Sequence, residues 1–205
     1  MDTPKNLNPI ARAKAVFQKH GGLLRMTTAV NSGIHRNTLK RMLAEGDVQK
    51  IDRGLYQLVD AVPPTDFDLA AVGAKAPAGV ICLISALSFH EITTQIPHVI
   101  WLAIRRNSEP PRIHYPPVRV FRFGDKTFSE GVEIHDVGPV KVRIYSREKT
   151  LADCFQYRNQ VGLDTCLEAV KMYKEQRRYN VDAIMKYAKI NRVAKIMRPY
   201  LEAIL

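Results

Sequence analysis

Four side chains between residues 36 and 41 have the chemistry needed to read a DNA duplex. An arginine can donate two hydrogen bonds to guanine and an asparagine can pair with adenine, and each good pair discriminates by about 1–3 kcal/mol. Lysine is better suited to holding a phosphate. We therefore predict base contacts from Arg36 and Asn37 and a phosphate contact from Lys40, with Arg41 beside them.

The surrounding sequence, residues 23–58, predicts elements that would present these side chains. Thr27 or Thr28 can cap a short helix, and the turn Asn31-Ser32-Gly33 ends it. The next helix is predicted over 36–45, and Gly46 ends it. Its apolar residues are expected to pack inward and leave the basic residues exposed; they are Ile34, Leu39, Met42 and Leu43.

A short β-hairpin is predicted after this helix. Residues 48–51 and 55–58 alternate with period two around Asp52-Arg53-Gly54, a sequence suited to a tight turn. This order of elements is that of a winged helix-turn-helix, with Arg53 near the wing tip. The predicted DNA-binding residues are Thr28, His35, Arg36, Asn37, Thr38, Lys40, Arg41, Lys50 and Arg53. The alternative is a small helical unit whose basic side is merely solvated.

Charge and composition agree with a polyanionic partner such as nucleic acid. The net charge is +11, and Lys and Arg exceed Asp and Glu by 10 to 5 over 1–60 and by 14 to 7 over 141–205, whereas residues 61–140 are nearly neutral. We expect no membrane segment, because no stretch approaches about 18 apolar residues and the first residues lack an apolar signal core. The widely spaced Cys82, Cys154 and Cys166 predict reduced core cysteines in a cytoplasmic protein, with no metal site and no cofactor.

Val62-Pro63-Pro64 predicts a boundary between a winged-helix domain over 1–62 and an α+β domain over 63–205. The second domain is expected to hold a mixed or antiparallel sheet followed by two or three C-terminal helices. Helices are predicted over 66–75 and, capped by Ser85, over 86–91, while 79–84 fits either a strand or a buried helix. Strands are predicted over 98–104, 118–123, 132–134 and 140–145.

Two groups of basic residues in the second domain allow alternative interpretations. Ser146 can cap a helix in which Lys149 and Asp153 form an i,i+4 ion pair, or Lys149 and Arg158 could bind a phosphate-bearing ligand near the helix start. Near the C-terminus, cations recur every third residue along what we expect to be the last helix, with Asn191 or a neighbour at its start. These cations are Lys186, Lys189, Arg192, Lys195 and Arg198. They could hold nucleic acid or an acidic protein surface, or form a solvated face.

Several motifs occur together in this chain. They are the turn and helix at 33–39, the wing Arg53-Gly54-Leu55-Tyr56, Ser85-Ala86-Leu87 with His90, Ile96-Pro97 and Trp101, and above all residues 145–155 with Tyr157-Arg158-Asn159 and Gly162. In these motifs, most of the chain resembles the AbiEi-type antitoxins of type IV toxin–antitoxin systems. The chain departs from the family pattern at His35, where a Ser or Thr cap is usual. Histidine caps a helix less well than Ser or Thr.

The resemblance implies a winged-helix transcriptional regulator that binds operator DNA upstream of its own operon as a repressor, self-association on DNA being one option. It further implies an α+β domain that opposes a nucleotidyltransferase-like toxin without a stable complex. The five C-terminal cations, with Lys149 and Arg158, are then the candidate effector surface.

The alternative is an endonuclease-like hydrolase, for which the available residues are His90-Glu91, His98, His114 and His135-Asp136. Their spacing matches no ligand motif, and no P-loop, HExxH or GxSxG motif is present, so we expect no enzyme.

Overall fold

The computed structural model describes residues 8–62, 66–138, 140–176 and 179–205 and divides into two compact units. The first unit comprises Met1–Ala76, Pro111–Pro116 and Asp136–Val142, and the second comprises Pro77–Pro110, Pro117–His135 and Arg143–Leu205. This division differs from the expected 1–62 and 63–205, because the helix after the wing and two later segments group with the first unit. Pro63 and Pro64, on which the expected boundary rests, lie outside the described residues.

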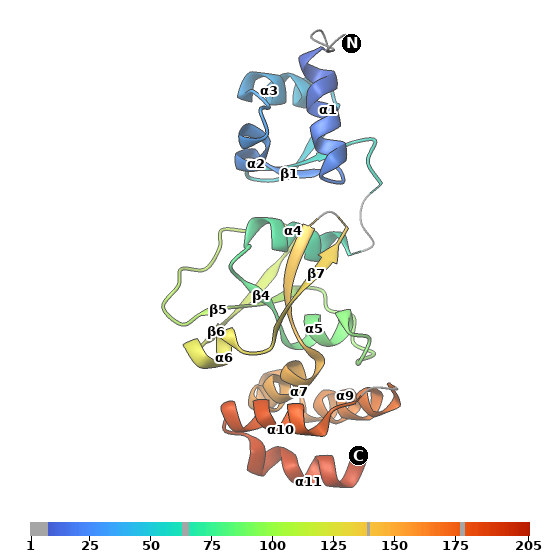
Figure 1. Ribbon diagram of the computed structural model, residues 1–205, viewed down its shortest axis with the longest axis vertical. Helices are drawn as coiled ribbons and strands as arrows, with labels where there is room; N and C mark the ends of the chain where they lie inside the picture. Colours follow the sequence, from blue (N-terminus) through green and yellow to red (C-terminus); the bar gives the residue numbers. More distant parts are fainter. Residues whose placement is uncertain (1–7, 63–65, 139, 177–178) are drawn as a thin grey trace, which may run out of the picture. The chain divides into compact units, whose positions relative to one another are not determined.

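The first unit has the element order of a winged helix-turn-helix (Figure 1). Its three strands form an antiparallel sheet in the order β1-β3-β2, in which Leu24 lies opposite Tyr56 and Gln49 opposite Gln57. The elements are α1 (Pro9–Lys19), β1 (Leu23–Arg25), α2 (Met26–Asn31), α3 (Arg36–Ala44), β2 (Val48–Asp52), β3 (Leu55–Leu58) and α4 (Phe67–Lys75). The predicted hairpin and the predicted helix over 66–75 are therefore confirmed.

The core of the winged helix is built from one side of α1 and one side of α3. Phe17 and Met42 are fully buried, and Leu39 joins them. Burying a side chain of this size contributes about 1.5–3 kcal/mol. Two local expectations are corrected. Leu43 was expected to pack inward but is 39% exposed, because it lies beside the buried residues of α3. Thr27 or Thr28 was expected to cap α2, but α2 starts after Arg25 without a side-chain cap, so both threonines lie inside the helix.

The last residue of α4 contacts a buried carboxylate of the first unit. Lys75 Nζ lies 3.0 Å from Asp52 Oδ2, and the backbone N–H of His114 donates to the same oxygen at 3.2 Å. Burial alone would raise the pKa of Asp52, but the hydrogen bonds from Lys75 and from the backbone N–H groups of Arg53 and His114 lower it to about 2.

The second unit contains most of a five-stranded mixed sheet in the order β6-β5-β4-β8-β7, as the predicted α+β class requires. β4 is antiparallel to β5 and parallel to β8, and β5 is parallel to β6. The strands are β4 (Val80–Ile81), β5 (Ile100–Arg105), β6 (Val118–Phe123), β7 (Val132–Val137) and β8 (Val140–Tyr145). β5 is buried along five of its six residues, which explains its continuous apolar sequence.

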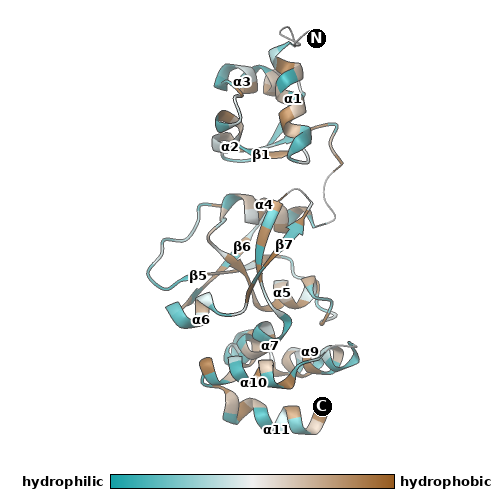
Figure 2. Cartoon of the chain, in the orientation of Figure 1, coloured by the Kyte–Doolittle hydropathy of each residue, from teal (hydrophilic) through white to brown (hydrophobic). Residues whose placement is uncertain are grey.

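Seven helices of the described chain accompany this sheet, five of them after β8 rather than the expected two or three. They are α5 (Leu83–Phe89), α6 (Asp125–Ser129), α7 (Arg147–Gln156), α8 (Arg158–Val161), α9 (Leu163–Glu175), α10 (Val181–Ile190) and α11 (Ala194–Ile204). Figure 1 shows α7, α9, α10 and α11 gathered at the C-terminal end of this unit. Hydrophobic and hydrophilic residues alternate along α10 and α11, as expected of helices that bury one side (Figure 2).

Ser85 corrects a further prediction, because it lies inside α5 and does not cap a helix. Its hydroxyl accepts a hydrogen bond from the N–H of Trp101 at 2.9 Å and therefore fastens α5 to β5. Residues 79–84 contain both predicted alternatives, the strand β4 and the start of α5. No helix in the described part of the chain is long and apolar enough to cross a membrane.

Candidate nucleic-acid interface

The start of α3 is fixed by an unusual cap. His35 is the N-cap, and its Nδ1 accepts a hydrogen bond from the N–H of Asn37 at 3.3 Å. The preceding turn is made by Gly33 at φ +86°, a conformation that side-chain-bearing residues rarely adopt. The helix therefore begins at Arg36, as predicted, although histidine replaces the usual Ser or Thr.

The exposed side of α3 carries the predicted reading residues. Leu39 and Met42 are buried, and at 100° per residue the opposite side holds Asn37, Lys40 and Arg41, with Arg36 at its border; all four are exposed. The exposure of these four side chains agrees with the sequence analysis, and their contact with DNA stays a prediction.

Arg41 lies on this face, and its side chain turns toward α1. Its guanidinium donates to Asn8 Oδ1 at 3.5 Å and forms an exposed ion pair with Glu45 at 3.3 Å. Exposed pairs of this kind contribute about 0–1 kcal/mol, so Arg41 can exchange this partner for a phosphate at little cost.

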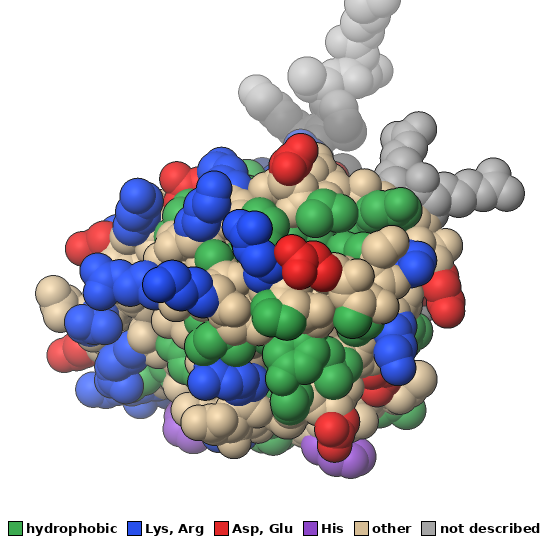
Figure 3. Space-filling model, turned by 90° about the horizontal axis from the view of Figure 1, so that it is seen from below, with side chains coloured by type: hydrophobic (Ala, Val, Ile, Leu, Met, Phe, Trp, Pro, Cys, Tyr) green, Lys and Arg blue, Asp and Glu red, His purple; other side chains and the backbone are tan. Residues whose placement is uncertain are grey.

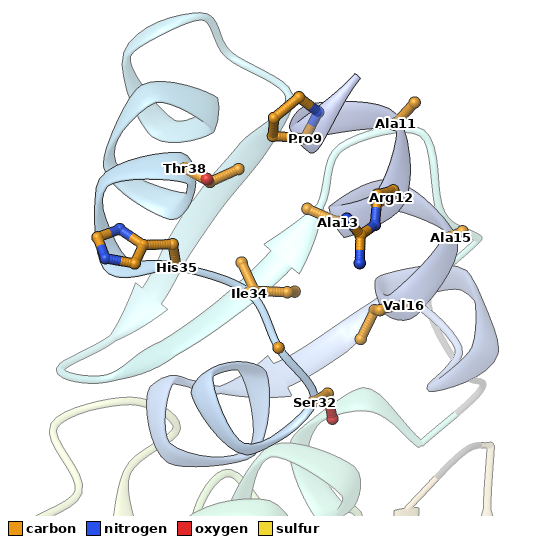
Figure 4. Close-up of a pocket in the computed structure, with 11 residues that line it drawn as sticks. Pro9, Ala11, Arg12, Ala13, Ala15, Val16, Ser32, Ile34, His35 and Thr38 are labelled. Carbon is orange, nitrogen blue, oxygen red and sulfur yellow. The ribbon is translucent and has the colours of Figure 1, made fainter. Parts of the chain in front are cut away.

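A pocket of about 470 Å³ separates α1 from the turn before α3 and from the first turn of α3. Figure 4 shows Ala13 and Thr38 pointing toward each other across it, while the His35 ring points away from α1. Arg12 of α1 also lines the pocket. Sequence reasoning missed Arg12, because only the folded packing of α1 brings its charge beside the start of α3.

The wing holds its exposed arginine on a well-braced turn. Asp52 Oδ1 accepts from the N–H of Arg53 at 2.6 Å, and Lys75 Nζ donates to the Arg53 carbonyl at 2.6 Å. Gly54 adopts φ +73°, and its carbonyl accepts from the N–H of Met26 at 2.8 Å. The Arg53 side chain remains exposed. Of the other predicted contacts, Lys50 and His35 are exposed, and Thr28 and Thr38 are half-buried.

Lys149 is fully buried, which corrects its assignment to an accessible effector surface. Its ammonium pairs with the equally buried Asp153, so the predicted i,i+4 ion pair is confirmed. Asn191 Nδ2 also donates to Asp153, at 2.6 Å, and the Lys149 ammonium lies 4.4 Å from the centre of the Tyr145 ring. Burial raises the pKa of the Asp153 carboxyl, an effect that the adjacent Lys149 opposes.

Arg158 shares no ligand site with Lys149, because Lys149 has no exposed surface. The Arg158 guanidinium is half-buried and donates to the Phe155 carbonyl at 3.1 Å.

The backbone at Gly131 lies close to the buried Lys149. Gly131 adopts φ +69°, and a Cβ there would lie 2.6 Å from Lys149 Cβ. This part of the second unit is therefore closely packed.

The five C-terminal cations do not lie on one helix, contrary to expectation. Lys186 and Lys189 belong to α10, Arg192 lies in the turn, and Lys195 and Arg198 belong to α11. Asn191 ends α10 and does not begin the last helix, because its side chain is drawn into the core by Asp153. All five cations are exposed.

Three of the histidines considered for a hydrolase each have a polar partner, and the rings of His90 and His135 lie edge to face with their centres 5.8 Å apart. His90 Nε2 lies 2.7 Å from the Tyr145 carbonyl, and burial lowers the His90 pKa. His135 pairs with Glu133 at 3.0 Å, and His114 with Asp52 at 3.1 Å. Within the described ranges, no group of three or more His, Cys, Asp or Glu residues is arranged to hold a metal ion.

The fold of the first unit is that of the winged helix-turn-helix class. Within it, residues 11–59 match the family model described as the transcriptional regulator AbiEi antitoxin, which confirms the resemblance recognised in the sequence over that region. Comparison with curated proteins gave no significant sequence match. Among solved structures, the chain is similar to the crystal structure of the RV2827C protein from Mycobacterium tuberculosis, with a TM-score of 0.59 and 9% identity over 96% of this chain and 82% of that one. At this identity the likeness extends to the fold alone.

Proposed function

We propose that this protein binds operator DNA through α3 and the wing and represses its own operon. The observation that carries the proposal is the exposed face of α3, where Asn37, Lys40 and Arg41 lie opposite the buried Leu39 and Met42, and Arg36 lies exposed at its border. A recognition helix of this kind enters the major groove with its first residues at the base edges. The family match over residues 11–59 supports a regulatory role.

Different residues of this surface are suited to base recognition and to phosphate binding. Arg36 and Asn37 have the donors and acceptors for base edges, whereas Lys40 and Arg53 supply charge for phosphates or the minor groove. Arg12 and Arg41 extend the positive surface beside the start of α3. Association of two copies on neighbouring half-sites is compatible with this arrangement.

We further propose that the second unit serves as the antitoxin part of a type IV system. It would oppose a nucleotidyltransferase-like toxin in the cytoplasm without forming a stable complex, and the proposal includes no catalytic step. This part is supported by the resemblance of residues 145–162 to AbiEi-type antitoxins and by the description of the family that matches residues 11–59.

A two-part cellular experiment tests the proposal. A reporter driven by the DNA upstream of the gene should be repressed by the full chain and released by Arg36→Ala with Asn37→Ala. Co-expression with the neighbouring gene product should show growth rescue by both proteins, because the two substitutions leave the second unit intact. Unchanged reporter activity with the wild-type chain would reject the repressor role, and absence of rescue at equal expression would reject the antitoxin role.

A further inference from the structure

Lys75, the last residue of α4, is an unusual lysine of the first unit. Most described lysines are exposed, and Figure 3 shows Lys and Arg side chains standing out from the face that it draws. The side chain of Lys75 is only 8% exposed, and that of its partner Asp52 is 3% exposed. Lysine is almost never buried without a partner, so this burial indicates a specific contact.

The Lys75 ammonium joins the two residues at the start of the wing turn. Its Nζ lies 3.0 Å from Asp52 Oδ2 and donates to the Arg53 carbonyl at 2.6 Å. Asp52 Oδ1 accepts from the Arg53 N–H at 2.6 Å, so both backbone polar groups of Arg53 are held. The path of the chain at Arg53 is therefore fixed in part by a side chain of α4.

The segment 111–116 adds two further contacts to the same carboxylate. The His114 N–H donates to Asp52 Oδ2 at 3.2 Å, and His114 Nδ1 lies 3.1 Å from Asp52 Oδ1. Asp52 therefore gathers the wing, α4 and the segment 111–116 at one point. Both Lys75 and His114 lie outside residues 11–59, over which the family model matches.

The strand pairing next to the wing turn is irregular. The register of β2 against β3 shifts between Lys50 and Asp52, where β2 has one residue more than β3. A bulge of this kind bends the strand and changes the direction in which the following residues point. The direction of Arg53 thus depends on contacts from outside the hairpin.

Lys75 is suited to positioning the turn and not to binding DNA directly. Two of the three donors of its ammonium are used by Asp52 and Arg53, and the side chain has little surface left for a phosphate. Stability alone does not require this pair, since replacing a buried ion pair by apolar residues is often neutral or stabilising. An apolar side chain, however, cannot hold the Asp52 carboxylate and the Arg53 carbonyl together.

We propose that Lys75 is a positioning residue for the wing, which sets how much Arg53 contributes to DNA binding without contacting DNA itself. The inference deepens the proposed function and rests on it, because it assumes that the wing contacts a duplex. It extends the DNA-binding unit to α4 and the segment 111–116, beyond the boundary expected at residue 62.

A double-mutant cycle in the full chain tests the proposal with a random duplex, because Arg53 is expected to contact any sequence. We expect Arg53→Ala to reduce the log–log salt slope by about 0.9 in the otherwise wild-type chain, and to have almost no effect in Lys75→Met, where Arg53 is no longer held. Lys40→Ala on α3 is the control and should reduce the slope by about 0.9 in both backgrounds. An equal effect of Arg53→Ala in both backgrounds, or no effect in the wild-type chain, would overturn the proposal.

A second measurement requires no DNA. Amide hydrogen exchange at Arg53, whose N–H donates to Asp52, should be faster in Lys75→Met than in the wild-type chain. The matched control is Lys14→Met, which breaks another Lys–Asp pair of the same unit, 2.6 Å from Asp47, without touching the wing turn. Unchanged exchange in Lys75→Met, or an equal rise in Lys14→Met, would contradict the role of Lys75.

A second variant covers the case in which Lys75→Met does not fold. Lys75→Gln keeps a polar end but is too short to reach both acceptors, so it takes the place of Lys75→Met with the same expected results and the same refutation. An operator duplex that the wild-type chain binds no better than the random duplex would reject the proposed function. That result would leave the cycle and the exchange measurement as separate tests of Lys75.

Discussion

Removing the carboxylate of Asp153 should strongly destabilise the second unit. Asp153 and Lys149 are both fully buried, so Asp153→Ala leaves an ammonium in the core with the rings of Tyr145 and Phe123 at 4.4 and 5.2 Å as its nearest compensation. Breaking a buried pair from one side costs about 3–5 kcal/mol. In a chain of this size, 1 kcal/mol shifts the melting temperature by about 2–4 °C, so the expected loss is roughly 6–20 °C.

The assay is urea unfolding followed by tryptophan fluorescence. Trp101 is the single tryptophan of the chain and is 6% exposed on β5, so its emission reports the second unit. The matched control is Asp125→Ala, which breaks the exposed pair with Arg105 at 3.0 Å in the same unit and should cost less than about 1 kcal/mol.

A double change completes the measurement. Lys149→Met with Asp153→Leu removes both charges and should be far less destabilising than the sum of the single changes, because no buried charge is left unpaired. A loss below about 1 kcal/mol for Asp153→Ala, or additive single and double effects, would refute the buried pair as an electrostatic unit.

Three further outcomes are expected in the first unit. Arg36→Ala should relax sequence preference in duplex binding, whereas Lys40→Ala should weaken all duplexes alike and reduce the salt slope by about 0.9; equal effects on specific and random DNA would contradict this division. Gly54→Val should destabilise the wing by about 1–3 kcal/mol in thermal melting and weaken DNA binding, because φ is +73° even though a Cβ would meet nothing within 4 Å; unchanged melting and binding would remove the strain argument. The pKa of Asp52 is lowered from 3.8 to about 2 on folding, so its stabilisation of about 2 kcal/mol is present above pH 4 and is lost as the pH falls toward 2. Melting of Asp52→Asn should therefore fall below wild type at pH 7 and converge with it near pH 2, and a difference independent of pH would contradict the assignment.

The winged helix could be predicted from sequence because its signals are local. Gly33 and Gly46 both adopt positive φ at the ends of the turn and of α3, and the spacing of Leu39 and Met42 alone fixes which side faces inward. The period-two pattern on each side of Asp52–Gly54 likewise defined the hairpin.

The remaining features depend on tertiary contacts that one sequence does not display. Ser85 precedes a helical pattern like a cap, yet its hydroxyl is used by the strand at Trp101. Lysine is usually an exposed residue, and only the packing of α7 among the sheet and the other helices places Lys149 in the core. The position of Arg12 beside the start of α3 likewise depends on the packing of α1.

The most direct test of the central claim is a binding titration of the purified full chain at fixed salt. It compares a duplex taken from the DNA upstream of the gene with a scrambled duplex of the same composition. Specific DNA-binding proteins typically prefer their sites by 10³-fold or more, and we expect a preference of about that size that is largely lost in Arg36→Ala with Asn37→Ala. Equal affinity of the wild-type chain for both duplexes would contradict the assignment of α3 as the reader of an operator.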